Sequence, residues 1–185
     1  MNEEITPKEL FEDIKYIQEL KDPRLLVLFL HLYIEHFINQ VSREKRIKAA
    51  GIMKKTEELS SRKIIDKDLA SIVDLINDLR NQLIHNLRPD QKLLERWIND
   101  FEAPFKPARE DAPIVLSEIK KFGIWEKIQI YSIPVVINLF KKLKELRNEK
   151  LDYDIVLAWN SKEDIWWFKY EKIGDKTNET TNASK

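Results

Sequence analysis

The sequence contains no cysteine and only three glycines among its 185 residues. Without cysteine the chain has no disulfide, no thiolate nucleophile and no cysteine ligand for a metal ion. It also has no Gly-rich phosphate-binding loop, no dinucleotide-binding fingerprint and no serine in a nucleophile-elbow motif. These absences argue against nucleotide-dependent enzymes with those loops, against thiol chemistry and against serine hydrolases of the elbow type.

The chain also lacks an excess of either charge. Lys and Arg together number 32, as do Asp and Glu, so the formal net charge is zero. Strong non-specific binding to nucleic acid depends on a broad basic surface, so any contact with RNA or DNA must be local here. A length of 185 residues with 43% hydrophobic and 35% charged residues is typical of one soluble, helix-rich domain.

Long apolar runs are missing as well. The longest candidate, residues 25–41, is interrupted by His31, Glu35, His36 and Asn39. No stretch near 18 uninterrupted apolar residues and no signal-type segment is present. We therefore expect a cytoplasmic protein without a membrane partner.

The first half of the chain carries repeated helix-start patterns. Thr6-Pro7 with Glu9 forms a potential capping box, and Asp22-Pro23 begins a second helix with a broad apolar face. A short charged helix is expected over residues 52–59. Asp66 can then cap a long helix over about residues 68–87, which Pro89 would end.

Further patterns predict how this bundle continues. Asp90 can cap an amphipathic helix to about residue 101, and this helix would complete a bundle of four or five helices over residues 1–102. Prolines at 104, 107 and 113 indicate an extended connector, followed by a short helix over residues 114–122. The fold class predicted is all-α.

Residues 103–174 are predicted to form a C-terminal extension packed on the same core. It contains a helix over about residues 125–148 that Pro134 should kink or break, and then a β-hairpin with strands at 155–159 and 165–170. Residues 175–185 have no apolar anchor beyond Ala183 and are predicted to be disordered.

The long helix over residues 68–87 carries the most informative residues. Arg80 falls inside its apolar stripe, about 40° from Ile76 on a regular helix, while Asn81 and His85 lie on a polar face. A buried arginine without a partner is very costly. Arg80 must therefore contact a carboxylate, a carbonyl group or an anionic ligand.

The run Leu79-Arg80-Asn81-Gln82-Leu83-Ile84-His85-Asn86 resembles the Arg-x4-6-His motif of the HEPN superfamily, in which a polar residue follows the arginine. The earlier run Leu32-Tyr33-Ile34-Glu35-His36-Phe37, with its acidic residue, is also similar to that family. The resemblance covers about residues 7–101. It implies a helical bundle, commonly dimeric, and in many members a metal-independent endoribonuclease of toxin–antitoxin or defence systems. Other members only bind or regulate partners.

These residue types suit RNA cleavage. RNA supplies its own nucleophile, the 2′-hydroxyl, so a group with a near-neutral pKa and a cation are sufficient. His85 would serve as acid or base, and Arg80 would stabilise the charge on the phosphorane-like transition state. Asn81 would orient the imidazole or bind a phosphate oxygen, and Glu35 would hold Arg80. No metal and no other cofactor is expected.

The helix imposes one constraint on this chemistry. Arg80 and His85 are about 140° apart on a straight helix, so they do not aim at one phosphate. Either the helix opens near His85 or two chains meet, and we predict a homodimer with a composite cleft. RNA is the expected substrate, and an antitoxin or regulatory protein is a further possible partner.

Other interpretations remain open at this point. One is a non-catalytic HEPN-like module that binds and regulates a protein or nucleotide, and another is a helical scaffold in which Arg80 and His85 only stabilise the fold. His31 and Glu35 have i, i+4 spacing, for which a hydrogen bond at the helix surface or between helices is favoured over a metal site. The run Lys141-Lys142-Leu143-Lys144 is favoured as a solvated helix face rather than an RNA-binding track.

Overall fold

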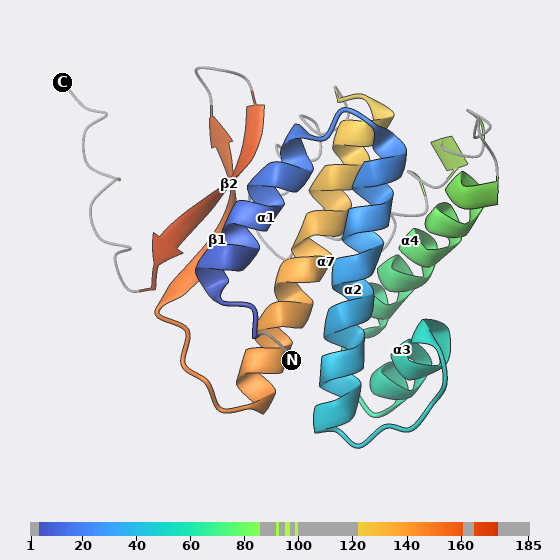
Figure 1. Ribbon diagram of the computed structural model, residues 1–185, viewed down its shortest axis with the longest axis vertical. Coiled ribbons are helices and arrows are strands. Elements are labelled where there is room, and N and C mark those ends of the chain that lie inside the picture. The colour runs from blue at the N-terminus through green and yellow to red at the C-terminus, as the bar shows by residue number, and fades with distance from the viewer. Residues whose placement is uncertain are drawn as a thin grey trace.

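The computed structural model describes residues 4–85, 122–160 and 165–173, together with the single residues 92, 95, 96 and 99. Within these residues the chain is mostly helical and has one antiparallel two-stranded sheet, which confirms a helical fold with a small hairpin (Figure 1). The helices are α1 (Pro7–Glu19), α2 (Pro23–Glu44), α3 (Ile52–Ser61), α4 (Lys67–His85) and α7 (Ile124–Leu146), and the strands are β1 (Tyr153–Asn160) and β2 (Ile165–Lys172).

Local capping interactions begin three of these helices at the expected residues. At the start of α1 the Glu9 carboxylate accepts a hydrogen bond from the Thr6 amide at 2.8 Å, and the Thr6 hydroxyl accepts one from the Glu9 amide at 3.2 Å. Asp22 caps α2, and Asp66 accepts from the Leu69 amide at 2.6 Å in the first turn of α4. These contacts satisfy amides that have no partner within the helix.

A glycine allows the chain to turn between α2 and α3. Gly51 has φ = 78°, a backbone conformation that residues with a Cβ rarely adopt. The chain then enters α3, which packs against both α2 and α4. After α3 the chain continues into α4, which packs against α2 (Figure 1).

The helix α7 lies at the centre of the fold beside α2 (Figure 1). Four of its side chains are completely buried, those of Tyr131, Ile133, Val136 and Leu139. Pro134 lies inside α7, and the helix continues through it without the break that was one of the two expected outcomes. Proline removes one backbone hydrogen bond, but buried residues on both sides of it keep the two halves of the helix in the core.

A single hydrophobic core joins the elements. It contains residues of α1, α2, α4 and α7, and it extends to Ile155 and Phe168 of the hairpin. The hairpin register pairs Tyr153 with Lys172 and Asn160 with Ile165. On the side facing α1, the ring of Tyr170 stacks on Phe11 at 5.5 Å and on Tyr153 at 4.8 Å between centroids.

Several expectations fall outside the described residues. They are the end of the long helix at residues 86–87, the stop at Pro89, the connector with Pro104, Pro107 and Pro113, the helix over residues 114–121 and the tail at residues 175–185. In the expected helix after Asp90, the four residues that are described, 92, 95, 96 and 99, are helical.

By length and composition, α2 meets the criterion for a membrane-spanning helix, and among the described helices it alone does so. Half of its most apolar window is buried inside the fold. The central helix of a soluble bundle meets the same criterion, so α2 is weak evidence for a membrane span.

Candidate functional site: the α2–α4 seam and the end of α4

A polar contact crosses the seam between α2 and α4. His31 is 5% exposed, and its Nε2 lies 3.1 Å from the Oδ1 of Asn77 on α4. The other ring nitrogen, Nδ1, lies 3.9 Å from the Oε2 of Glu35, too far for a hydrogen bond. The structure therefore shows the interhelical hydrogen bond favoured for His31, and no cluster of three or more potential metal ligands occurs in the part of the chain that it describes.

Arg80 is partly buried beside this seam. Its Nη1 donates a hydrogen bond to the Oδ1 of the adjacent Asn81 at 2.9 Å. Its Nε is buried and has no hydrogen-bond partner among the described residues. Glu35 forms no ion pair with Arg80 within residues 4–85, and its carboxylate lies near His31 instead. The structure thus brings Arg80 and Asn81 together but does not join Glu35 to them.

His85 is the last residue of α4 that the structure describes, and it is exposed to solvent. Because α4 is helical through His85, no opening of the helix occurs between Arg80 and His85. The two side chains leave the helix about 140° apart.

Two carboxylates lie on the same side of α4 as His85. Asp78 lies about two helical turns before His85, and Asp74 lies one turn earlier still. Burial raises the pKa of Asp74, and the nearby carboxylates of Asp78 and Glu57 raise it further. The Oδ1 of Asp74 is buried without a hydrogen-bond partner in the described structure. This negative charge opposes the approach of a phosphate to His85 from that side.

Exposed aliphatic side chains accompany the site. On α2, Leu25 and Leu32 are 44% and 51% exposed, and their separation of about two turns places them on one face of the helix. On α4, Ile84 is 52% exposed and directly precedes His85. Single exposed aliphatics are ordinary on a protein surface, and these three belong to the two helices that carry the site residues.

Comparison with protein-family models, curated proteins and solved structures finds no match to this chain. The resemblance to HEPN proteins therefore rests on the motif residues and their helical setting. Any function has to be inferred from the side chains themselves.

A second polar group, between α2 and α7, was not expected from the sequence. Lys144 was assigned to a solvated helix face, but its side chain is only 7% exposed and contacts two carboxylates. The reason is visible in the spacing, because Ile137, Phe140 and Lys144 follow the helical period of the apolar stripe. Arg80 was singled out because it is a cation within the apolar stripe of its helix, and Lys144 occupies the same kind of position.

Proposed function

We propose that this protein is a metal-independent, HEPN-like endoribonuclease of the toxin or defence type, with Arg80 and His85 as catalytic residues. The observation that carries this proposal is the end of α4, where an exposed His85 follows an Arg80 whose guanidinium is held by Asn81. The chemistry needs an imidazole open to substrate and a fixed cation, and these two residues have those properties.

The proposed reaction is a transesterification. The neutral imidazole of His85 accepts the proton of the RNA 2′-hydroxyl, and the 2′-oxygen attacks the adjacent phosphorus. The bond from phosphorus to the 5′-oxygen breaks, the leaving oxygen takes up a proton from water, and a 2′,3′-cyclic phosphate remains. His85 then releases the proton it accepted to the solvent. Arg80 stabilises the charge that develops on the phosphorane oxygens. Each role contributes on the order of 10²-fold or more to the rate.

A second copy of the chain completes this site. Because α4 stays helical through His85, Arg80 and His85 of one chain point in different directions. An isologous dimer places Arg80 of one copy opposite His85 of the other. In this dimer the exposed side chains of Leu25, Leu32 and Ile84, which lie on the same two helices, would add apolar contacts wherever the partner chain covers them.

The test is RNA cleavage in EDTA by the wild type, Arg80→Ala and His85→Ala, with Arg62→Ala as a control because Arg62 is an exposed arginine at the end of α3. We expect each site variant to lose about 10²-fold or more of the activity while its circular dichroism spectrum is unchanged. Arg62→Ala should retain full activity. Activity that persists in both site variants would refute the catalytic assignment.

Mixing the two inactive variants tests the composite site. After subunit exchange about half of the dimers contain one copy of each variant, and in these one of the two shared sites is intact. The mixture should therefore recover about a quarter of wild-type activity. If Arg80 and His85 act within one chain, the mixture stays inactive, and the dimer model is wrong.

A second candidate is a non-catalytic HEPN-like module that binds a protein or nucleotide partner. The carboxylates of Asp74 and Asp78 on the His85 side of α4 favour it, because they repel a phosphate backbone. In that case the wild type cleaves none of several structured and single-stranded RNAs. For a plain scaffold, Arg80→Ala only lowers stability and His85→Ala has little effect.

A further inference from the structure

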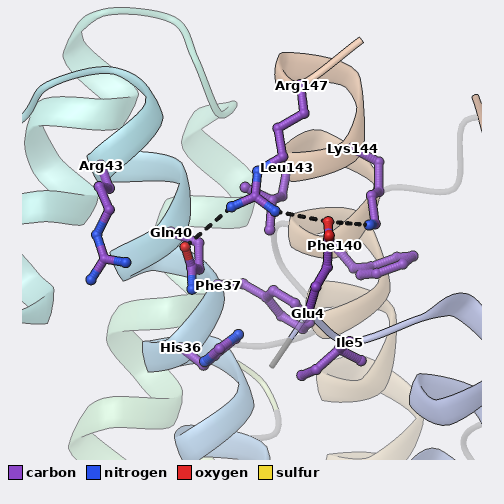
Figure 2. A pocket seen from close by; sticks show the side chains of 10 residues that line it. All are labelled: Glu4, Ile5, His36, Phe37, Gln40, Arg43, Phe140, Leu143, Lys144 and Arg147. Atoms are coloured by element: carbon purple, nitrogen blue, oxygen red, sulfur yellow. Dashed lines mark hydrogen bonds and ion pairs between the residues drawn. The ribbon is translucent and has the colours of Figure 1, made fainter. Parts of the chain in front are cut away.

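A pocket of about 350 Å³ lies between α2, α7 and the segment before α1, and neither Arg80 nor His85 lines it (Figure 2). Small-ligand pockets begin at about this size. Its wall is part aromatic and aliphatic and part cationic. The lining residues that matter here are Phe37, His36 and Arg43 of α2 and Phe140, Lys144 and Arg147 of α7 and its C-terminal end.

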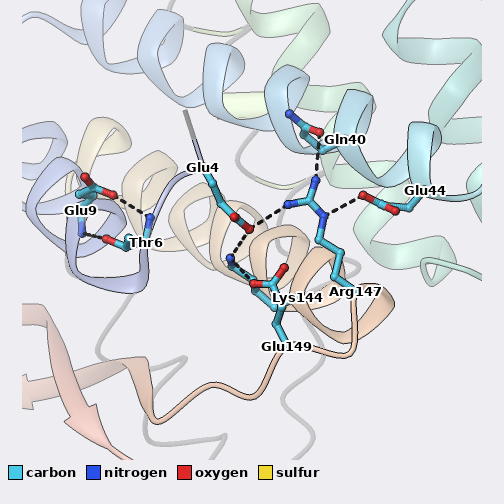
Figure 3. Close-up of polar contacts among 8 residues, drawn as sticks. All are labelled: Glu4, Thr6, Glu9, Gln40, Glu44, Lys144, Arg147 and Glu149. Atoms are coloured by element: carbon cyan, nitrogen blue, oxygen red, sulfur yellow. Dashed lines mark hydrogen bonds and ion pairs between the residues drawn. The ribbon is translucent and has the colours of Figure 1, made fainter. Parts of the chain in front are cut away.

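One carboxylate already occupies the cationic end of the pocket. The Oε1 of Glu4 accepts hydrogen bonds from the Nζ of Lys144 at 2.8 Å and from the Nη1 of Arg147 at 3.0 Å (Figure 3). The Lys144 hydrogen bond and charge, together with the charge of Arg147, lower the pKa of Glu4. Two cations converging on one oxygen form the arrangement that proteins use to hold an oxyanion.

The two cations keep other partners if Glu4 leaves. Lys144 donates to the Oε2 of Glu149 at 2.6 Å, and Arg147 donates from Nε to the Oε1 of Glu44 at 2.7 Å. Burial alone would lower the pKa of Lys144, but its hydrogen bonds to Glu149 and Glu4 outweigh burial and raise it. Glu4 itself has a side chain that is 54% exposed. If the Glu4 side chain moves out of the pocket, no buried charge is therefore left without a partner.

The α2 side of the pocket carries uncompensated positive charge. Arg43 lines the pocket, and its guanidinium makes no hydrogen bond or ion pair within the described part of the chain. Burial lowers the pKa of His36, and the charges of Arg43 and Arg147 lower it further. Arg43 and Arg147 thus both act on His36, so an anion that enters the pocket beside His36 meets positive charge from Arg43, which has no carboxylate partner among the described residues.

We propose that this pocket binds a small organic phosphate, whose phosphate group replaces the Glu4 carboxylate between Lys144 and Arg147. A phosphate carries more charge and more acceptor oxygens than a carboxylate, so it suits a pocket whose wall carries Arg43 in addition to Lys144 and Arg147. The organic part lies along Phe37 and Phe140, which line the same pocket. Glu4 acts as an internal competitor for the site. The pocket works independently of the proposed RNA cleavage.

The experiment titrates full-length protein with phenyl phosphate, using calorimetry and thermal denaturation, with inorganic phosphate and benzoate as separate arms. We expect saturable binding of phenyl phosphate, about tenfold or more tighter than either inorganic phosphate or benzoate, and a melting temperature that rises with ligand concentration. Amide NMR signals of residues 36–43 and 140–147 should shift on titration.

Three variants decide the mechanism. Glu4→Gln should bind phenyl phosphate several-fold tighter, because the competing charge is removed. Arg43→Gln should bind it several-fold more weakly. Lys45→Gln is the matched control, since Lys45 is an exposed cation at the same end of α2 that does not line the pocket, and it should bind like the wild type.

Four results would overturn the proposal. They are the absence of saturable binding, equal affinity for phenyl phosphate and inorganic phosphate, equal weakening in Arg43→Gln and Lys45→Gln, and unchanged or weaker binding by Glu4→Gln. Melting temperatures of the unliganded variants confirm that each is folded before titration. RNA cleavage by Arg43→Gln should stay at the wild-type level, so failure of this proposal is distinguishable from failure of the ribonuclease assignment.

Discussion

Asp74 is the described residue whose replacement gives the clearest prediction for stability. Its Oδ1 is buried without a hydrogen-bond partner, and Asp78 and Glu57 place two further negative charges near it. Asn has the same shape without the charge. We therefore expect Asp74→Asn to increase the free energy of unfolding at neutral pH.

The expected increase in the free energy of unfolding for Asp74→Asn is the sum of separate contributions. A like-charged pair one helical turn apart costs about 0.2–0.5 kcal/mol, and Glu57 adds a similar repulsion. Partial burial of the charge adds to this, and solvent screening reduces it. The sum is about 1 kcal/mol, which for a chain of this length raises the melting temperature by about 2–4 °C.

The pH dependence separates a charge effect from a packing effect. Because the pKa of Asp74 is raised above its ordinary value of 3.8, the folded state holds this proton to higher pH than the unfolded state does. Preferential protonation of Asp74 in the folded state stabilises the fold. This contribution to the free energy of unfolding is complete below pH 3.8 and is lost as the pH rises through the raised pKa. The advantage of Asp74→Asn should therefore grow between about pH 4 and about pH 7.5.

Thermal and urea denaturation at several pH values measure this difference. Asp68→Asn is the control, because Asp68 is exposed in the first turn of the same helix and favours the helix dipole, so its loss should destabilise by about 0.5 kcal/mol. The charge effect at Asp74 is refuted if Asp74→Asn is not more stable at neutral pH, or if its advantage is the same at all pH values.

Three further predictions concern other described residues. Thr6→Ala removes the capping box with Glu9 and should lower the free energy of unfolding by about 1 kcal/mol in urea denaturation, whereas Thr6→Ser should not. Tyr33→Phe removes the hydrogen bond to Asp13, so we expect a loss of about 1 kcal/mol in the same assay, and an unchanged midpoint would contradict this contact. The lowered pKa of His36 means that the unfolded state takes up its proton at higher pH, so stability falls as pH drops below 6.5. The melting temperature of His36→Gln should fall less than that of the wild type between about pH 7.5 and about pH 5.5, and parallel curves would refute this assignment.

Local features of the fold were predictable because their causes lie within a few residues. The caps at Thr6, Asp22 and Asp66 each use a side chain that meets an amide two or three positions later. The hairpin was indicated by two β-branched and aromatic runs separated by five residues, although its strands extend further, over β1 and β2, than those runs.

The placement of α7 was less accessible to sequence reasoning. The sequence assigned it to an extension on the bundle, and the structure makes it the main partner of α2. Periodicity shows that a helix has an apolar face but does not show which other helix covers it. In α7 the buried residues surround much of the helix, which is the pattern of a central element.

The candidate site was predictable in part. The motif residues Arg80, Asn81 and His85 lie on one helix, as expected, and their angular separation is a consequence of helix geometry alone. Which residues Arg80 and Glu35 contact was not predictable. Glu35 lies near His31, and Arg80 contacts its own neighbour, because the register between α2 and α4 is set by the packing of many side chains.

The sequence by itself determined where helices begin, which residues form the hairpin and that Arg80 and His85 point in different directions. Those features depend on hydrogen bonds and spacing over one or two turns. Only the tertiary structure decided that Glu4 meets Arg147, 143 residues later in the chain, and that Lys144 is buried rather than solvated. Contacts of this kind depend on which apolar faces pack together, and the packing of the entire core determines which faces meet.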